Sequence, residues 1–350
     1  MFNDFKLYQE DIHTIAISNI DWKCFTGKSI LITGATGLIG TFLIDLLMYR
    51  NTSYNNNITI YAIGRNKEKA LLRFKDYFCS PYFHFVSKDL QYPLNIDASI
   101  DFIIHGASHT HPVAYATEPI NTIMLSVLGT KSILDFAYAH NVKRTLFLST
   151  VEIYGENRGD TETFNENYCG NIDCNTLRAG YPEGKRVSEA LCQAYIKEKN
   201  IDIVIARCSR IYGSTMGNDD SKVIAQFIRS AIKKENITLK SNGTQLYSYT
   251  YVADICSALL LLLIKGENTH AYNIANTSEN LSLFQIASIL SDYVEKKVIF
   301  DLPSSVEFIG YSKATKALLD CAKMKEFGWE AKYPLKDGLI RTVEILRSIP

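Results

Sequence analysis

The sequence lacks a C-x-x-C pair, a basic cluster, a signal-peptide core and any long apolar segment. Its eight cysteines are scattered, which argues against a zinc site or a disulfide framework and indicates free thiols in a reducing compartment. Lys+Arg and Asp+Glu number 37 each, so no charge excess points to nucleic acid. The longest apolar run, residues 259–264, is far shorter than the roughly 20 residues of a membrane span. We therefore expect a cytoplasmic protein with no nucleic-acid partner, no membrane segment and no metal site.

A glycine pattern follows the first apolar run of the chain. Residues 30–33 are apolar or β-branched, three glycines spaced three apart come next, and the amphipathic segment 41–49 follows. This order predicts a strand, a phosphate-binding turn and a helix whose free N–H groups face an anion. Gly34 allows the sharp turn, Gly37 the close approach of a pyrophosphate, and Gly40 the packing of helix on strand. A glycine-rich turn without a ligand is the alternative. The other residues of the turn expected at the cofactor are Thr36, Leu38 and Ile39.

Strands and helices alternate along the first two thirds of the chain. The expected strands are residues 58–63, 84–88, 102–105, 145–148 and 201–206. The expected helices are residues 67–78, 120–139 and 186–197. This alternation predicts an α/β fold with a doubly wound parallel sheet of the Rossmann type, whose ligands bind beyond the carboxyl ends of the strands.

The expected organisation has three parts. Residues 1–28 are an N-terminal extension, for which we expect a helix and a lead-in strand without chemistry. Residues 29–207 form mainly the NAD(P)-binding domain, and residues 208–350 form mainly a smaller α/β lobe. Since the sequence has no low-complexity linker, the two lobes are expected to interleave.

The ends of three strands carry further residues expected at the cofactor. The second strand ends in Gly-Arg-Asn, where an acid would bind the ribose of NAD and an arginine suits the 2′-phosphate of NADP. Arg65 therefore favours NADP, although NAD remains open and a solvated arginine is the alternative. Asp89 and Leu90, after the third strand, are expected to cap the adenine. Ala107 and Ser108, after the fourth, are small enough for the chain to pass close to the cofactor.

Two histidines follow in the same loop. His109 and His111 have no acidic residue nearby, so they are interpreted as loop residues rather than metal ligands.

Residues suited to catalysis follow the fifth strand and begin the next helix. Ser149, Thr150 and Glu152 fall beyond the strand end, where ligands bind in such sheets. Tyr181 and Lys185 are four residues apart, so they share one face of a helix. A lysine cation beside the phenol is expected to lower the pKa of Tyr181 and suit it to general acid–base chemistry. Thr150 is placed to orient the reacting alcohol.

Together these motifs resemble the extended short-chain dehydrogenases/reductases that act on nucleotide sugars. The matching stretches are Gly34-x-x-Gly37-x-x-Gly40, Asp89-Leu90, residues 149–155, residues 178–186 and Tyr251-Val252-Ala253-Asp254. Within that family the sequence is most similar to UDP-glucuronate decarboxylases and dTDP-glucose 4,6-dehydratases. The resemblance implies a nucleotide-diphosphate sugar as partner, a lobe that grips it, a homodimer paired through helices 120–139 and 186–197, and a role in polysaccharide biosynthesis.

The resemblance also implies a mechanism. Bound NAD(P) would oxidise carbon 4 of the sugar, while Tyr181 takes the hydroxyl proton, Thr150 hydrogen-bonds that hydroxyl and Lys185 binds the nicotinamide ribose. The 4-keto group would make a carboxylate on carbon 5 a β-keto acid. Glu152 matches a glutamate of the decarboxylases and dehydratases. Val151 replaces the acid with which the dehydratases expel the C6 hydroxyl, so dehydration is disfavoured.

The chain departs from these relatives at two expected substrate-binding positions. Arg210 stands where the family usually has an asparagine, and Tyr247 stands where the decarboxylases have an arginine. Arg210 is expected to contact a phosphate or a sugar carboxylate and so to replace the missing charge. Ser149 and Thr150 complete the expected substrate contacts. Lys313 and Lys316 are expected either to contact the diphosphate or to be solvated.

The sequence thus predicts an enzyme that forms a 4-keto nucleotide sugar and is most like a UDP-glucuronate decarboxylase. A nucleotide-sugar 4-epimerase or an NADPH-dependent 4-keto-sugar reductase is the alternative. A 4,6-dehydratase and a non-catalytic dinucleotide-binding protein are less favoured.

Overall fold

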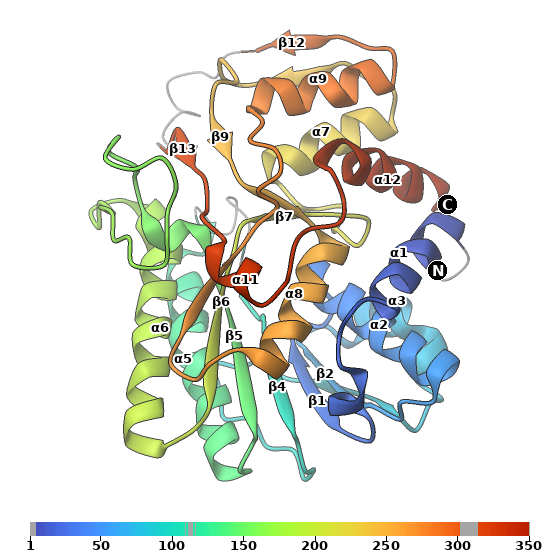
Figure 1. Ribbon diagram of the computed structural model, residues 1–350, viewed down its shortest axis with the longest axis vertical. Helices are drawn as coiled ribbons and strands as arrows, with labels where there is room; N and C mark the ends of the chain where they lie inside the picture. Colours follow the sequence, from blue (N-terminus) through green and yellow to red (C-terminus); the bar gives the residue numbers. More distant parts are fainter. Residues whose placement is uncertain (1–4, 109, 111–114, 116, 302–313, 350) are drawn as a thin grey trace.

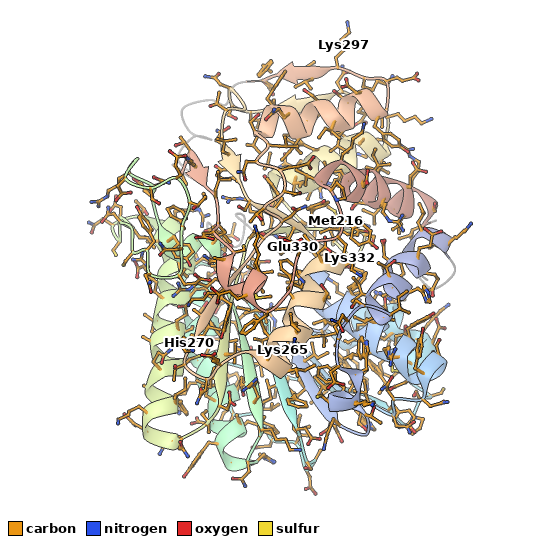
Figure 2. The ribbon with its side chains drawn as sticks, in the orientation of Figure 1. Met216, Lys265, His270, Lys297, Glu330 and Lys332 are labelled. Atoms are coloured by element: carbon orange, nitrogen blue, oxygen red, sulfur yellow. The ribbon has the colours of Figure 1, made fainter. Side chains whose placement is uncertain are left out.

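The computed structural model describes residues 5–108, 110, 115, 117–301 and 314–349. A large sheet with helices on both faces forms one part of the molecule, and a smaller lobe lies beyond one end of its strands (Figure 1). In Figure 2, Lys297 projects from the outer end of the smaller lobe, whereas Lys265 and His270 lie at the level of the large sheet. No helix among the described residues is both long and apolar enough to cross a membrane.

The large sheet has seven parallel strands in the order β11-β6-β5-β4-β1-β2-β3. The strands are β1 Ser29–Thr33, β2 Thr59–Gly64, β3 Phe83–Ser87, β4 Phe102–His105, β5 Arg144–Thr150, β6 Ile203–Cys208 and β11 Ala271–Ile274. All five residues of β1 are buried, as the apolar run requires for a strand covered on both faces. The expected doubly wound α/β fold is therefore confirmed. Strand β11 comes from the C-terminal part of the chain and completes one edge of the sheet.

Helices cover both faces of this sheet (Figure 1). One face is covered by α5 Pro119–Ala139 and α6 Gly180–Lys199, which pack against each other. The other carries α2 Leu38–Tyr54, α3 Lys67–Phe74 and α8 Val252–Lys265. Helix α6 begins at Gly180 rather than near Arg186, so Tyr181 and Lys185 both lie inside it. Their side chains therefore have the fixed spacing of a regular helix.

In the described part of the smaller lobe, short strand pairs pack against three helices. Its helices are α7 Val223–Ile232, α9 Leu283–Tyr293 and α12 Leu335–Ser348, and the short α11 Ala322–Glu326 lies against β11. Its strand pairs are β7 Arg210–Tyr212 with β10 Tyr249–Tyr251, β8 Ile237–Leu239 with β12 Val298–Phe300, and β9 Leu246–Tyr247 with β13 Lys316–Ala317. All three pairs are parallel, so the strands of each pair are joined by a long connection rather than a tight turn.

The N-terminal extension differs from the expectation in its second half. Helix α1, Lys6–Ala16, is present, but residues 22–25 form a 3₁₀ turn instead of a lead-in strand. The side chain of Asp21 accepts a hydrogen bond from the backbone N–H of Lys23, which stabilises the turn. The expected strand was wrong because its apolar residues fit a short turn that buries Trp22 and Phe25 equally well.

Buried carboxylates join α1 to both parts of the molecule. Tyr8 donates a hydrogen bond of 2.5 Å to Asp45 of α2. Asp11 accepts hydrogen bonds from the Tyr251 hydroxyl at 2.5 Å and from the Arg341 Nε at 2.7 Å. Helix α1 thereby connects the helix after the glycine turn with the smaller lobe.

Candidate active site

A cavity of about 700 Å³ lies between the carboxyl ends of the large sheet and the smaller lobe. Most of the residues that the sequence predicts for the site line this cavity: Gly34, Thr36, Gly37, Leu38, Ile39, Gly40, Arg65, Leu90, Ala107, Ser108, Ser149, Thr150, Glu152, Tyr181, Lys185, Arg210 and Tyr247. Asp89 is not among the described residues that line the cavity, and its side chain accepts a hydrogen bond from the Gln91 backbone N–H instead. One cavity therefore holds nearly all the residues that sequence patterns had singled out.

The glycine turn allows three segments to approach closely. Gly34 has a φ of +71°, and a Cβ there would lie 2.9 Å from the carbonyl oxygen of Gly106. A Cβ on Gly40 would lie 2.5 Å from the carbonyl oxygen of Gly34. Helix α2 begins at Leu38 with Gly37 as its N-cap, so its unpaired N–H groups border the cavity. This backbone cradle and the positive end of the helix suit a pyrophosphate.

His105, at the end of β4, is the centre of a buried chain of hydrogen bonds. Its Nε2 lies 3.3 Å from Thr130 Oγ1, which itself donates at 2.6 Å to the Ser126 carbonyl. Because the Thr130 proton is used there, Nε2 must carry the proton of the neutral ring. Burial and the nearby Lys185 lower the pKa of His105 to about 3, which keeps the ring neutral. Its bare Nδ1 then accepts the Thr33 hydroxyl at 2.7 Å.

The same chain fixes the loop after β4. The Thr33 oxygen accepts the backbone N–H groups of Gly106 at 3.1 Å and Ala107 at 3.0 Å. The hydrogen-bond chain ends at the Ser126 carbonyl, which also accepts a hydrogen bond of 2.8 Å from Ser188 Oγ of α6. The chain therefore joins the strand before the glycine turn, the loop at the cavity and the helix that carries Lys185.

Lys185 and Tyr181 lie side by side in α6, but the lysine does not lower the pKa of the phenol. Lys185 Nζ donates at 2.7 Å to the Leu148 carbonyl, and burial lowers the pKa of Lys185 to about 8. Burial, together with the charge of Glu152, raises the pKa of Tyr181, while a hydrogen bond from Thr150 opposes the rise. The expectation of a lowered pKa was therefore wrong for the protein's own groups, because burial of the phenol outweighs the interactions that favour its ionised form.

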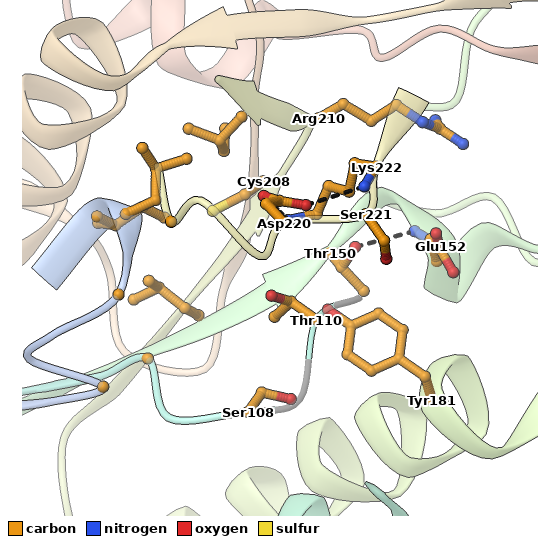
Figure 3. A pocket seen from close by; sticks show the side chains of 18 of the residues that line it. Ser108, Thr110, Thr150, Glu152, Tyr181, Cys208, Arg210, Asp220, Ser221 and Lys222 are labelled. Carbon is orange, nitrogen blue, oxygen red and sulfur yellow. Dashed lines mark hydrogen bonds and ion pairs between the residues drawn. The ribbon is translucent and has the colours of Figure 1, made fainter. Parts of the chain in front are cut away.

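Glu152 has a partner that sequence reasoning missed. Arg178 Nη2 donates to Glu152 Oε2 at 2.6 Å, and its guanidinium lies 4.9 Å from the ring centre of Tyr115. The Tyr115 ring stacks on Tyr181 at a centroid distance of 4.9 Å and an angle of 16°. The backbone N–H of Glu152 also donates to Thr150 Oγ1 at 3.3 Å, as Figure 3 shows. Arg178 precedes Tyr181 by only three residues, and this short spacing is a signal that could have identified Arg178. No comparable feature of the sequence marks Tyr115.

The two positions that depart from the related enzymes are in direct contact. The guanidinium of Arg210 lies 3.6 Å from the centre of the Tyr247 ring. The Tyr247 hydroxyl donates at 2.6 Å to the Ala314 carbonyl, which holds the ring in place. Stacking of this kind is worth about 0.5–2 kcal/mol, depending on how far the cation is desolvated. Arg210 is thus presented to the cavity on a fixed aromatic surface.

Two lysines accompany Arg65 at the end of β2. Lys88 donates its backbone N–H to the Gly64 carbonyl at 3.0 Å, and Lys69 lies in the first turn of α3, whose N-cap is Asn66. All three cations line the cavity, so this end is suited to a phosphate.

The remaining candidates are one described residue, which lies outside the cavity lining, and three that the structure does not describe. Lys316 forms an ion pair with Glu162 and is not among the cavity-lining residues. Lys313, His109 and His111 lie outside the described residues. Within the described residues, no group of three or more His, Cys, Asp or Glu side chains is arranged to hold a metal.

Comparisons with known proteins agree with this geometry. The sequence model of the NAD dependent epimerase/dehydratase family matches residues 30–275. UDP-glucuronic acid decarboxylase 6 of Arabidopsis thaliana is 32% identical over 311 residues, which are 89% of this chain and 86% of that protein. UDP-glucuronic acid decarboxylase 1 of Danio rerio is 30% identical over 323 residues, or 91% and 72% of the two chains.

Solved structures share the fold. UDP-glucose 4-epimerase from Thermotoga maritima superposes with a TM-score of 0.77 at 22% identity, covering 91% of this chain and 98% of its own. UDP-glucuronic acid 4-epimerase from Bacillus cereus, solved with UDP-glucuronic acid and NAD, gives a TM-score of 0.77 at 22% identity, covering 92% and 100%.

Proposed function

Because this chain belongs to the NAD-dependent epimerase/dehydratase family, we propose that it is an enzyme that oxidises carbon 4 of a nucleotide sugar. The observation that carries the proposal is the convergence of Thr150, Tyr181 and Lys185 on the cavity that the glycine turn borders. A non-catalytic dinucleotide-binding protein would have no need of this trio. The cradle at Gly34 and Gly40, which a Cβ would fill, fits the pyrophosphate of NAD(P).

The chain's own residues suit the first chemical step. Tyr181 accepts the proton of the C4 hydroxyl, and Thr150 hydrogen-bonds that hydroxyl and orients it. Lys185 holds the nicotinamide ribose and supplies a positive charge close to the phenol. When bound, a nicotinamide would supply the hydride acceptor that the oxidation of carbon 4 needs and the hydride for a later reduction. Burial and Glu152 raise the pKa of Tyr181, and the positive charge of a bound oxidised nicotinamide would oppose that rise and favour the phenolate.

Decarboxylation is the reaction we propose for the 4-keto sugar. The keto group makes a carboxylate on carbon 5 a β-keto acid, so the bond to that carboxylate breaks, CO₂ leaves and the electron pair remains as an enolate. A proton from solvent on carbon 5, a hydride returned to carbon 4 and the proton returned by Tyr181 to the C4 oxygen would complete the product. Dehydration needs an acid to expel the C6 hydroxyl, and Val151 at the matching position is buried and has none.

A 4-epimerase or an NADPH-dependent 4-keto-sugar reductase is the second candidate. The cations Arg65, Lys69 and Lys88 at one end of the cavity favour it, because a reductase would draw on NADPH. Incubation with UDP-glucuronate, UDP-glucose and their 4-keto derivatives separates the candidates. Release of CO₂ without added cofactor supports decarboxylation, isomerisation supports an epimerase, and stoichiometric NADPH consumption contradicts decarboxylation.

The cofactor preference can be measured directly by binding. We expect wild-type protein to bind NADPH more tightly than NADH, and Arg65→Gln to weaken NADPH binding by about tenfold, because one charge-assisted hydrogen bond to the 2′-phosphate is lost. NADH binding by the same variant serves as the control and should change less than about twofold. Tighter binding of NADH than of NADPH by the wild type would overturn the preference.

We further propose a homodimer that works in the cytoplasm on polysaccharide precursors. Exposed apolar side chains on the outer surfaces of α5 and α6 support the dimer: Ile120, Met124, Tyr138 and Val187. All eight cysteines are free and three of them are exposed, which suits a reducing compartment. Light scattering should give about twice the 39.5 kDa of one chain.

A further inference from the structure

One connection of the smaller lobe reaches the helix after the glycine turn directly. Residues 213–222 run from the end of β7 to the start of α7, and Thr215 lies near the beginning of this connection. The buried Thr215 Oγ1 donates a hydrogen bond of 2.7 Å to the carbonyl oxygen of Leu38, the first residue of α2. The bond therefore ties the lobe to the end of α2 that borders the cavity.

This connection is folded on itself. The backbone N–H groups of Met216 and Asp220 donate to the carbonyls of Gly213 and Gly217, each at 3.2 Å. Asp220 also holds the start of α7, because its carboxylate accepts the backbone N–H of Lys222 at 3.0 Å and pairs with the Lys222 ammonium at 3.0 Å. Figure 3 shows this ion pair beside the cavity. A ligand that fixes one end of the connection therefore fixes Thr215 as well.

The same segment carries polar atoms that await a ligand. Among the described side chains, Oγ of Ser221 and Nη1 of Arg210, in the preceding strand β7, are buried without a hydrogen-bond partner, and both residues line the cavity. Native proteins satisfy nearly all buried polar groups, so a polar ligand is expected to pair with these two. In Figure 3, Arg210 and Lys222 lie on one side of the cavity and Ser108 and Tyr181 on the other.

The two sides of the cavity suit different ligands. The glycine turn and the unpaired N–H groups at the start of α2 suit the pyrophosphate of the cofactor. The lobe side, with Arg210 and Ser221, is left for the nucleotide sugar. Thr215 lies between Arg210 and Ser221 in the chain and bonds to α2. It is thus the link between the two binding sides.

Other contacts of α2 are less suited to this role. The thiol of Cys256 approaches the Ile39 carbonyl at 3.8 Å, but a thiol is a weak donor. Tyr8 bonds to Asp45, which lies about two turns further along α2 and away from its free N–H groups. The hydroxyl of Thr215 bonds to the first residue of the helix, where the pyrophosphate is expected.

We propose that Thr215 is a positioning residue through which a nucleotide sugar bound to the lobe holds the cofactor in its cradle. This inference rests on the proposed function. A nucleotide sugar that pairs with Ser221 and Arg210 fixes the connection, and the Thr215 bond then fixes the first turn of α2. Because coupling between two binding sites is reciprocal, the bound cofactor tightens the binding of the nucleotide sugar by the same factor. The cofactor thus stays bound while the sugar is present, as a reaction that removes and returns the same hydride requires.

The test measures NADPH affinity by fluorescence titration, without and with saturating UDP-glucuronate. The reduced cofactor cannot oxidise the sugar, so only binding is observed. We expect UDP-glucuronate to tighten NADPH binding to the wild type by about tenfold, within the usual range of coupling between sites. Thr215→Val keeps the shape of the side chain but removes the donor, so the tightening should fall below about twofold. Thr215→Ser, which keeps the hydroxyl, should retain most of it.

A second threonine provides the matched control. The buried hydroxyl of Thr342 donates at 2.7 Å to the Gly338 carbonyl within α12, and Thr342 is not among the described residues that line the cavity. Thr342→Val therefore loses a bond of the same kind and should keep the tenfold tightening. Thr215→Ala, a second variant without the donor, should repeat the result of Thr215→Val.

The opposing outcomes separate the inference from the proposed function. Full tightening in Thr215→Val or Thr215→Ala would overturn the inference alone, as would an equal loss in Thr342→Val or a wild type that binds both ligands without coupling. If UDP-glucuronate does not bind to the NADPH-loaded wild type, the proposed function fails and the coupling through Thr215 fails with it.

Discussion

Tyr181→Phe should lower turnover by about a hundred- to ten-thousandfold, the usual contribution of a general acid–base group. The substitution removes only the phenol oxygen, so the ring still stacks on Tyr115 and the fold is expected to persist. NAD(P) binding should change little, because the glycine turn and Lys185 remain. Steady-state rates, cofactor affinity and thermal unfolding of the same preparation test all three expectations.

A second tyrosine of the same helix provides the matched control. The hydroxyl of Tyr195 bonds to Asp135 and does not line the cavity. Tyr195→Phe removes the same atom from α6 and should keep more than half of the activity. A Tyr181→Phe protein that turned over as fast as the Tyr195→Phe control would remove Tyr181 from the mechanism.

Gly34→Ala should reduce turnover on the order of a hundredfold, and it should weaken NAD(P)H binding. Two effects combine at this position. A side chain at φ +71° costs about 1–2 kcal/mol, and the new Cβ would lie only 2.9 Å from the Gly106 carbonyl oxygen. The loop after β4 must then move away, and a shift of about 1 Å at a reacting site can cost a hundredfold in rate. Fluorescence titration with NADPH and steady-state rates measure both losses.

Gly27→Ala separates the two effects. Gly27 has a φ of +68°, but a Cβ there meets nothing within 4 Å. This variant should lose about 1–2 kcal/mol of unfolding free energy and keep its cofactor affinity. Equal cofactor affinity in the Gly34 and Gly27 variants would show that contact with Gly106 plays no part in forming the site.

Features with a local cause could be predicted from the sequence. The apolar run before Gly34 and the glycine spacing are local, and the alternation of strands with helices predicts a parallel sheet without any distance information. The four-residue spacing of Tyr181 and Lys185 placed both on one helix face. The raised pKa of Tyr181 comes first from burial in the folded protein, which the residue spacing does not show, so it was not predictable.

Pairings between distant segments account for most of what was missed. Arg178 and Glu152 are 26 residues apart, and Tyr115 reaches Tyr181 from another segment of the chain. Arg210 had been singled out, but its contact with Tyr247 depends on strand pairing in the lobe. In the N-terminal extension the opposite happened, because a lead-in strand was expected there and residues 22–25 form a turn that an aspartate caps.

The hydrogen bonds around His105 also determine where protons can travel. Every donor from Thr33 through His105 to Thr130 is committed, and the chain ends on the Ser126 carbonyl, which has no proton to pass on. A proton relay from the reacting centre through the protein interior therefore cannot follow this route. In the proposed reaction, the proton taken up by Tyr181 therefore does not leave along this chain of hydrogen bonds.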